Sequence, residues 1–219
     1  MKFKNQEDVY LVAGGPSLQN FNWSLLKDKA TIAINNAIFD VPDPDVFVTV
    51  DNSFFHKIKC KMKQFAETTA HKVFVVDMSY GYIVEEKGFF YDTRKRERKA
   101  YLTNCVDTII KAYKQYGIGK HMNDFRTGKN SGFCALQLAY LKGFKRIHLL
   151  GFDLTVTEDT HYHNVYDGCF KHPFKQTLET YQKYFMRALP KILAQGTEVI
   201  SHSSISTLNN TIPYEELTK

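Results

Sequence analysis

Short apolar runs rich in β-branched residues constrain the fold of this chain more than any other feature. They cover residues 9–13, 31–34, 46–50, 72–77 and 147–150. Apolar residues follow one another in these runs without regular polar alternation, which is typical of parallel strands buried on both faces. We therefore predict an α/β fold, in which a mostly parallel, Rossmann-like sheet carries helices on both faces. No internal repeat or linker interrupts residues 1–219, so we expect a single domain.

The ends of these runs are small or polar. The turn Gly14-Gly15-Pro16-Ser17 follows the first run, Asn35-Asn36 the second and Asp51-Asn52 the third, and Gly151-Phe152-Asp153 ends the run at 147–150. In open α/β sheets the carboxyl ends of the strands form the ligand crevice. The glycines at 14 and 15 can present backbone N–H groups to an anion, and Ser17 can cap a helix or contact a phosphate. These strand ends are candidate ligand contacts.

The rest of the chain supplies helices and one irregular stretch. We predict helices over 53–69, 106–116, 133–141 and 176–194, and a last strand over 197–200. Asn130-Ser131-Gly132 precedes the helix at 133–141 and adds a helix N-terminus to the candidate site. Residues 78–101 have no clear period, and we interpret 78–125 as an excursion that could act as a lid.

Charge and composition indicate which kinds of partner and which cellular compartment suit the protein. The formal net charge is +6, and the excess is concentrated in two basic runs, Lys57–Lys63 and Arg94–Lys99. Such runs with nearby aromatic residues favour DNA or another polyanion as a partner, although a solvated face is the commoner explanation. The four cysteines are widely spaced and indicate neither a zinc site nor a disulfide framework. We find no signal peptide and no membrane span, so we expect a cytoplasmic protein.

Five motifs together resemble a known superfamily. They are GGPSL at 14–18, INNA at 34–37, DVFVTVD at 45–51, NSGFCALQLAYLKGFKRIHLLGFDL at 130–154 and SHSSIS at 201–206. This pattern is similar to the Rossmann-like glycosyltransferases that include the Campylobacter-type sialyltransferases and the central domains of motility accessory factors. The archaeal hydroxymethyl-dihydropterin diphosphokinase is a further relative. One departure is Ala13, where the family pattern has the first glycine of its loop.

The resemblance implies a role for several residues. Gly14, Gly15 and Ser17 would cradle the phosphates of a nucleotide. Asn35 and Asn52 would contact the donor or its sugar, and Ser131 the ribose or a phosphate. His172, just before the long C-terminal helix, would be the general base. Tyr162 and Tyr166 would steady the departing phosphate.

The residue chemistry is consistent with glycosyl transfer. An acceptor hydroxyl needs a base, which a histidine supplies near neutral pH, and tyrosine hydroxyls and backbone N–H groups can stabilise a leaving phosphate without a metal. The loop after Asp153 concentrates such residues, among them His161 and His163, although solvated loop histidines are the plain alternative. An extended His161-Tyr162-His163 would be poor geometry for one metal ion.

We predict a metal-independent glycosyltransferase that uses a nucleotide-sugar donor and needs no other cofactor. Its favoured acceptor is a modified DNA base; a surface glycan, lipid or flagellin-like protein is the competing acceptor class. The alternative is a Mg²⁺-dependent diphosphokinase of a small heterocycle, with the ion held by Asp51 and Asp153. A non-catalytic module that binds a nucleotide or nucleic acid is the third hypothesis. The sequence does not identify the oligomeric state.

Overall fold

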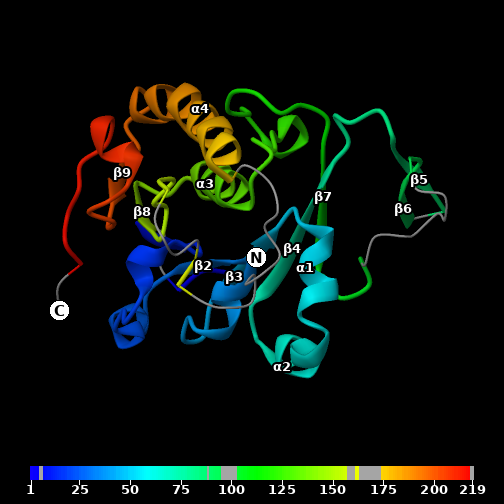
Figure 1. The fold of residues 1–219 in the computed structure, drawn as a ribbon, viewed down its shortest axis with the longest axis horizontal. Helices are drawn as coiled ribbons and strands as arrows, with labels where there is room; N and C mark the ends of the chain where they lie inside the picture. Colours follow the sequence, from blue (N-terminus) through cyan, green and yellow to red (C-terminus); the bar gives the residue numbers. More distant parts are fainter. Residues whose placement is uncertain (5–6, 88, 95–102, 157–160, 163–173, 218–219) are drawn as a thin grey trace.

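A seven-stranded sheet forms the centre of the protein (Figure 1). The computed structural model describes residues 1–4, 7–87, 89–94, 103–156, 161–162 and 174–217. The strand order is β7-β4-β3-β2-β1-β8-β9, and neighbouring strands pair in parallel. The strands are β1 (Asp8–Val12), β2 (Thr31–Ile34), β3 (Val46–Thr49), β4 (His71–Asp77), β7 (Thr108–Ala112), β8 (Arg146–Leu150) and β9 (Glu198–Ser201). The predicted parallel α/β sheet is confirmed.

Helices cover both faces of this sheet because every strand has apolar side chains on both sides. The helices α3 (Ser131–Leu141) and α4 (Phe174–Leu193) pack on one face, while α1 (Asn52–Lys57) and α2 (Met62–Glu67) pack on the other (Figure 1). Residues 131–139 of α3 are all buried, as expected for a helix between the sheet and a second helix. In the parts of the chain that the structure describes, no helix combines the length and apolar character needed to cross a membrane.

Two predicted helices are wrong, and the stretch interpreted as an excursion contains regular strands. Residues 106–116 are not a helix, because Thr108–Ala112 form β7 and pair with β4. The helix predicted over 53–69 is interrupted, since α1 and α2 are separated by a short 3-10 turn at Lys59–Lys61. The predicted excursion over 78–125 includes β7 of the main sheet. Within the described part of 78–101, β5 (Ile83–Glu86) and β6 (Phe89–Asp92) form a separate antiparallel pair.

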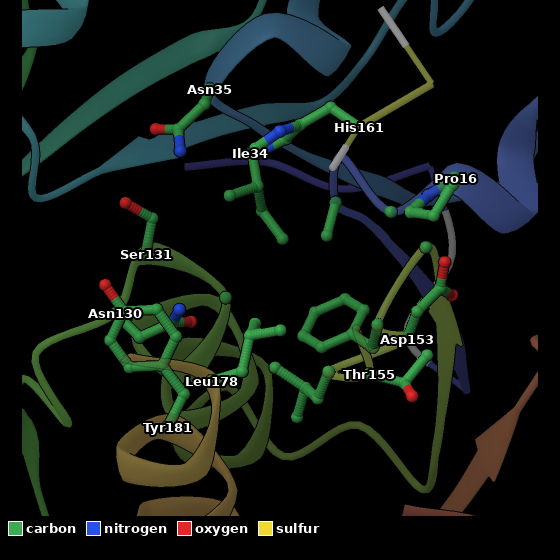
Figure 2. A pocket seen from close by; sticks show the side chains of 16 residues that line it. Pro16, Ile34, Asn35, Asn130, Ser131, Asp153, Thr155, His161, Leu178 and Tyr181 are labelled. Atoms are coloured by element: carbon green, nitrogen blue, oxygen red, sulfur yellow. The ribbon is translucent and has the colours of Figure 1, made fainter. Parts of the chain in front are cut away.

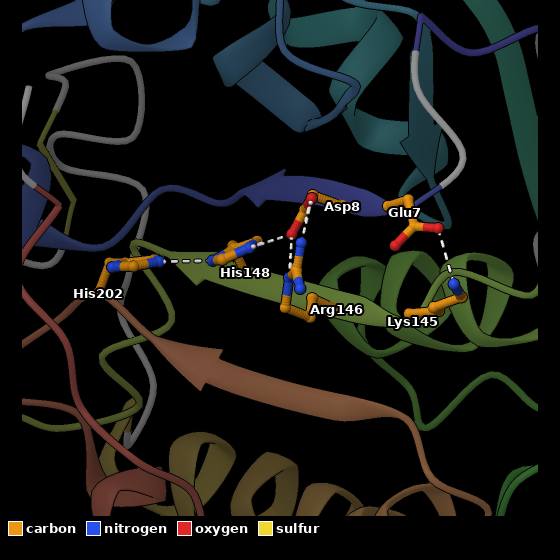
Figure 3. A network of polar contacts seen from close by, with 6 residues as sticks. All are labelled: Glu7, Asp8, Lys145, Arg146, His148 and His202. Atoms are coloured by element: carbon orange, nitrogen blue, oxygen red, sulfur yellow. Dashed lines mark hydrogen bonds and ion pairs between the residues drawn. The ribbon is translucent and has the colours of Figure 1, made fainter.

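A polar network ties together strands that are distant in the sequence (Figure 3). The guanidinium of Arg146 on β8 donates to the Asp8 carboxylate on β1, with Nη2 2.8 Å from Oδ2. His148 Nε2 lies 3.2 Å from Asp8 Oδ1, and His148 Nδ1 lies 2.9 Å from His202 Nε2. The Tyr10 ring stacks on His148, with 4.3 Å between ring centroids. This network links β1, β8 and the segment after β9.

Candidate functional site

A pocket lies at the carboxyl ends of the strands where the order of the sheet reverses. From β1 the chain builds β2, β3, β4 and β7 on one side and later places β8 and β9 on the other. Such switch points are the usual ligand sites of open α/β sheets. The pocket encloses about 140 Å³ (Figure 2). Its lining comes from the ends of β1, β2 and β8 and from α3 and α4: Ala13, Gly15, Pro16, Ile34, Asn35, Asn130, Ser131, Gly132, Gly151, Phe152, Asp153, Leu154, Thr155, His161, Leu178 and Tyr181.

The turn after β1 holds a carboxylate of the protein itself. The backbone N–H of Ser17 donates to Asp153 Oδ2 at 2.8 Å, and the Ser17 hydroxyl donates to Asp153 Oδ1 at 2.6 Å. The Gly15 N–H donates to the Gly151 carbonyl at 2.9 Å. These donors therefore hold the turn after β8 in place. The sequence had led us to predict that they would cradle a phosphate. Asp153 is only 2% exposed and needs such partners, because a buried charge without hydrogen bonds is costly.

Close packing explains the glycine at position 15. A Cβ built there would lie 2.5 Å from Asp153 Oδ2 and 2.5 Å from the Gly151 carbonyl oxygen. Both distances are far shorter than any real carbon–oxygen contact, so one of the two turns would have to move. The sequence signal was correct in requiring a residue without Cβ, but the group that approaches the backbone here is Asp153.

The end of β2 presents an amide to the pocket. Asn35 has a φ of 53°, a left-handed conformation that asparagine tolerates better than most residues. The Asp51 N–H donates to Thr49 Oγ1 at 3.0 Å, and the Thr49 hydroxyl donates to Asn35 Oδ1 at 2.7 Å. This order of donors turns the amide nitrogen of Asn35 toward the Ser131 side of the pocket (Figure 2). Asn35 can therefore donate to a ligand oxygen.

The first turn of α3 forms the opposite wall. Asn130 caps the helix, because its Oδ1 accepts from the Phe133 N–H at 2.9 Å. Ser131 Oγ accepts from the Val50 N–H at 3.1 Å, which fixes α3 against the end of β3. The first N–H groups of a helix have no acceptor within it, and the helix dipole adds positive potential there. The backbone N–H groups of Ser131 and Gly132 thus give the pocket a wall suited to an anion.

Five predicted contacts do not line the pocket, although the structure describes all of them. Gly14 and Ser17 belong to the turn after β1, Asn36 is buried in the 3-10 turn Asn35–Phe39, and Asn52 starts α1. Asp51 caps α1, since its carboxylate accepts from the Ser53 N–H and hydroxyl, each at 2.8 Å.

The pair Asp51 and Asp153 does not fit the Mg²⁺ site considered from the sequence. Asp51 lies outside the pocket, 3.8 Å from Lys57 Nζ, and both carboxylates are already held by neighbouring donors. Among the described residues, no three His, Cys, Asp or Glu side chains gather at a spacing that would hold a metal ion.

Of the two described residues at 161–162 in the loop after β8, one lines the pocket and the other does not. His161 lines the pocket on the same side as Asn35 (Figure 2). Tyr162 points elsewhere: its hydroxyl donates to Asp40 Oδ2 at 2.8 Å and its ring packs near Trp23, with 5.5 Å between ring centroids. In this structure Tyr162 therefore does not occupy the predicted leaving-phosphate position. His172 and Tyr166 lie outside the described residues, and their roles stay predictions.

Sequence reasoning missed the contribution of α4 to the pocket, which comes from Leu178 and Tyr181. Their spacing of three positions was the available signal, but it is also the spacing of an ordinary core-facing stripe. Burial raises the pKa of Tyr181, and the nearby Asp51 carboxylate acts in the same direction. The Tyr181 hydroxyl therefore stays protonated near neutral pH and can donate a hydrogen bond.

Comparisons with known proteins bear on the fold and on the family of the chain. Over 98% of this chain and 82% of that one, the structure is similar to the crystal structure of the monofunctional alpha-2,3-sialyltransferase Cst-I from Campylobacter jejuni. The TM-score is 0.55 at 15% identity, which shows a shared fold. A search of curated proteins gives no match. A family model described as "6-hydroxymethylpterin diphosphokinase MptE-like" matches residues 1–159, which is most of the chain. The chain therefore belongs to the MptE-like family.

Proposed function

We propose that the protein is a transferase that binds a nucleotide co-substrate in the switch-point pocket and moves a glycosyl group from it to an acceptor hydroxyl. One observation carries the proposal: the first turn of α3 and the Asn35 amide form two donor-rich walls that face each other across the pocket. A phosphate between them would accept from backbone and amide N–H groups. With about 140 Å³, the pocket would enclose only part of a nucleotide, because complete ligand sites usually measure about 300–1,000 Å³.

The described residues can supply the chemistry of such a transfer. The Ser131 and Gly132 N–H groups and the Asn35 amide would bind the phosphate. The Tyr181 hydroxyl would donate to the oxygen that gains charge as the glycosyl bond breaks. His161 is the histidine among the described lining residues and would take the proton of the acceptor hydroxyl. His172 remains the alternative base.

Pyrophosphoryl transfer is the second candidate, and the family match favours it. The same pocket would then hold a nucleoside triphosphate, and the transferred group would be a diphosphate. The two candidates differ in their products. Glycosyl transfer releases a nucleoside mono- or diphosphate from a nucleotide sugar, whereas diphosphokinase activity converts ATP to AMP.

A ligand screen tests the proposal directly. The melting temperature is measured with CMP, UDP, GDP, ADP and ATP, with Mg²⁺ and with EDTA, because a ligand that binds only the folded state raises it. We expect one mono- or diphosphate to stabilise the wild type in EDTA but not a Ser131→Pro variant, which lacks one of the α3 N–H donors. A different outcome would favour the second candidate over glycosyl transfer: only ATP raises the melting temperature, and only when Mg²⁺ is present. Phosphorus NMR would then show AMP as the product. No stabilisation by any nucleotide would refute both.

The acceptor is the less constrained part of the proposal. The basic run at 57–63 is partly neutralised, since Lys57 lies 3.8 Å from Asp51 and Lys63 lies 3.9 Å from Glu67. Of the run at 94–99, only Arg94 is among the described residues. A nucleic-acid acceptor therefore needs support from another part of the surface.

A further inference from the structure

A second hollow lies at the same edge of the sheet as the nucleotide pocket. It has a volume of about 420 Å³ and is lined by Ser79, Lys114, Gln115, Tyr116 and Arg126. Ser79 follows β4, and residues 114–116 follow β7, so the hollow is built on the carboxyl ends of two strands. The proposed reaction uses none of these side chains.

Helix α4 places the two cavities next to each other. Tyr181 lines the nucleotide pocket, whereas Tyr184 supports the second hollow by stacking on Tyr116, with 4.9 Å between ring centroids and 25° between ring planes. The two α4 residues are three positions apart, which corresponds to about 4.5 Å along a helix axis. The two cavities are therefore both supported by neighbouring residues of one turn of α4.

Hydrogen bonds hold the floor of the hollow in place. The buried Tyr184 hydroxyl donates to Gln115 Oε1 at 3.3 Å, and Gln115 Nε2 donates to Ser79 Oγ at 2.7 Å. The Ser79 hydroxyl in turn donates to the carboxylate of Asp77 at the end of β4. The Thr127 hydroxyl donates to the other Asp77 oxygen at 2.9 Å. A connected polar floor of this kind is ordered before any ligand arrives.

The chemistry of the walls is aromatic and cationic. The Tyr116 side chain is 57% exposed, and the guanidinium of Arg187 lies 5.1 Å from the centre of its ring. Lys114 and Arg126 bring two more cations, while Asp124 is their common carboxylate partner at 3.5 and 2.8 Å. Three cations therefore outnumber the one carboxylate paired with them. A flat ring beside excess positive charge suits a ligand that carries both a planar group and an anion.

A second aromatic stack extends this surface. The rings of Tyr80 and Tyr82 stack, with 5.0 Å between centroids and 18° between planes. Lys129 Nζ lies 5.3 Å from the centre of the Tyr80 ring, and the Arg94 guanidinium lies 3.4 Å from the centre of the Tyr82 ring. Tyr80 follows Ser79 of the hollow directly, and Lys129 precedes the Asn130 cap of the nucleotide pocket. Aromatic and cationic groups thus recur from one cavity toward the next.

We propose that the second hollow and the Tyr80–Tyr82 stack bind single-stranded nucleic acid as the acceptor of the transferase. Repeated aromatic rings with adjacent cations are the features by which proteins bind single strands, since each base can stack and each phosphate can meet a cation. The inference rests on the proposed function, because it names the second substrate of the same site. The hydroxyl that receives the glycosyl group belongs to a nucleotide held on Tyr116.

Binding of a fluorescent single-stranded oligothymidylate to the full chain, measured by anisotropy, tests this inference. We expect Tyr116→Ala to weaken binding by about tenfold or more, because stacking on one base contributes that much, whereas Tyr116→Phe keeps the ring and the affinity. Lys114→Gln should reduce the slope of log affinity against log salt by about 1. Tyr214→Ala is the matched control, since Tyr214 is 45% exposed on the C-terminal segment, away from the hollow. The melting temperature of each variant checks that it is folded.

The results separate this inference from the proposed function. Equal binding of wild type and folded Tyr116→Ala, or equal binding of an abasic strand and the oligothymidylate by the wild type, would overturn the acceptor site. The nucleotide screen would then still support the transferase if its stabilisation persists in Tyr116→Ala. If no nucleotide stabilises the wild type, the proposed function fails, and the acceptor role fails with it even where the strand binds.

Discussion

Replacing Asp153 tests whether this residue only supports the structure of the pocket or also contacts the ligand. Its carboxylate accepts two hydrogen bonds from Ser17, at 2.8 and 2.6 Å, and is almost fully buried. A hydrogen bond to a charged group contributes about 1.5–3 kcal/mol. Asp153→Ala removes both acceptors and leaves two Ser17 donors without a partner, so we expect a loss of about 3–5 kcal/mol in the free energy of unfolding.

Asp153→Asn should behave differently because it keeps the shape and both contacts. The amide oxygen can accept from the Ser17 N–H, and the amide nitrogen can donate to Ser17 Oγ once the hydroxyl rotates. Only the charge-assisted part of each bond is lost, so we expect about 1 kcal/mol of destabilisation. If Asp153 supports the turn without touching the ligand, the Asn variant also keeps the nucleotide affinity of the wild type.

Guanidinium denaturation gives the free energies, and titration calorimetry with the stabilising nucleotide gives the affinities. Asp51→Asn is the matched control for affinity, since Asp51 is a carboxylate at a neighbouring strand end but caps α1 outside the pocket. An Ala variant as stable as the wild type would refute the energetic reasoning. A stable Asn variant that no longer binds nucleotide would show that the carboxylate contacts the ligand or its counter-ion directly.

Three further predictions concern sterics, hydrogen bonding and pH. Gly15→Val should lose nucleotide-induced stabilisation and cost about 1–3 kcal/mol by overpacking, whereas Gly81→Ala, where a Cβ meets nothing within 4 Å, should match the wild type in a thermal-shift assay. Tyr181→Phe should weaken nucleotide binding about tenfold by calorimetry, and an unchanged affinity would remove its hydroxyl from the proposed mechanism. The hydrogen bond from Arg146 lowers the pKa of Asp8 from 3.8 to about 2. Because the pKa of Asp8 is lower in the folded than in the unfolded protein, its ionised carboxylate contributes about 2 kcal/mol to the free energy of unfolding above pH 3.8. This contribution is lost as the pH falls from 3.8 through 2. Asp8→Asn should therefore be less stable at pH 7 and lose less stability between neutral pH and pH 2; parallel denaturation curves for the two proteins would contradict this.

Much of the sheet could be predicted because its signals are local. Buried parallel strands require continuous apolar runs, and such runs marked β1, β2, β3, β4 and β8 close to their observed positions. β7 was missed because it lacks a continuous apolar run. Exposed Ile109 alternates with buried Ile110 in a short edge strand, and its pairing with β4 depends on residues about 35 positions away. A local pattern does not reveal that partner.

In the candidate site too, residues with a local sequence signal were predicted, whereas residues positioned by distant contacts were not. Asn35, Ser131 and Asp153 were found because each follows a strand or starts a helix, and the topology brings such positions to one edge. Tyr181 was missed because a pocket residue on α4 has the same spacing as a core residue. Tyr162 was misplaced because its neighbours Asp40 and Trp23 come from distant segments of the chain.

The sequence alone determined that the chain forms a parallel α/β sheet and that the backbone after β1 must turn through residues without a Cβ at position 15. Those properties depend on the apolar pattern and on glycine, which act over a few neighbouring residues. Only the tertiary structure decided what approaches that turn. Ser17 and Asp153 are 136 positions apart, and they meet because β1 and β8 are adjacent in the sheet. The donors that the sequence suggested for a phosphate therefore bind a carboxylate of the protein, and we propose the first turn of α3 as the wall that binds the anion.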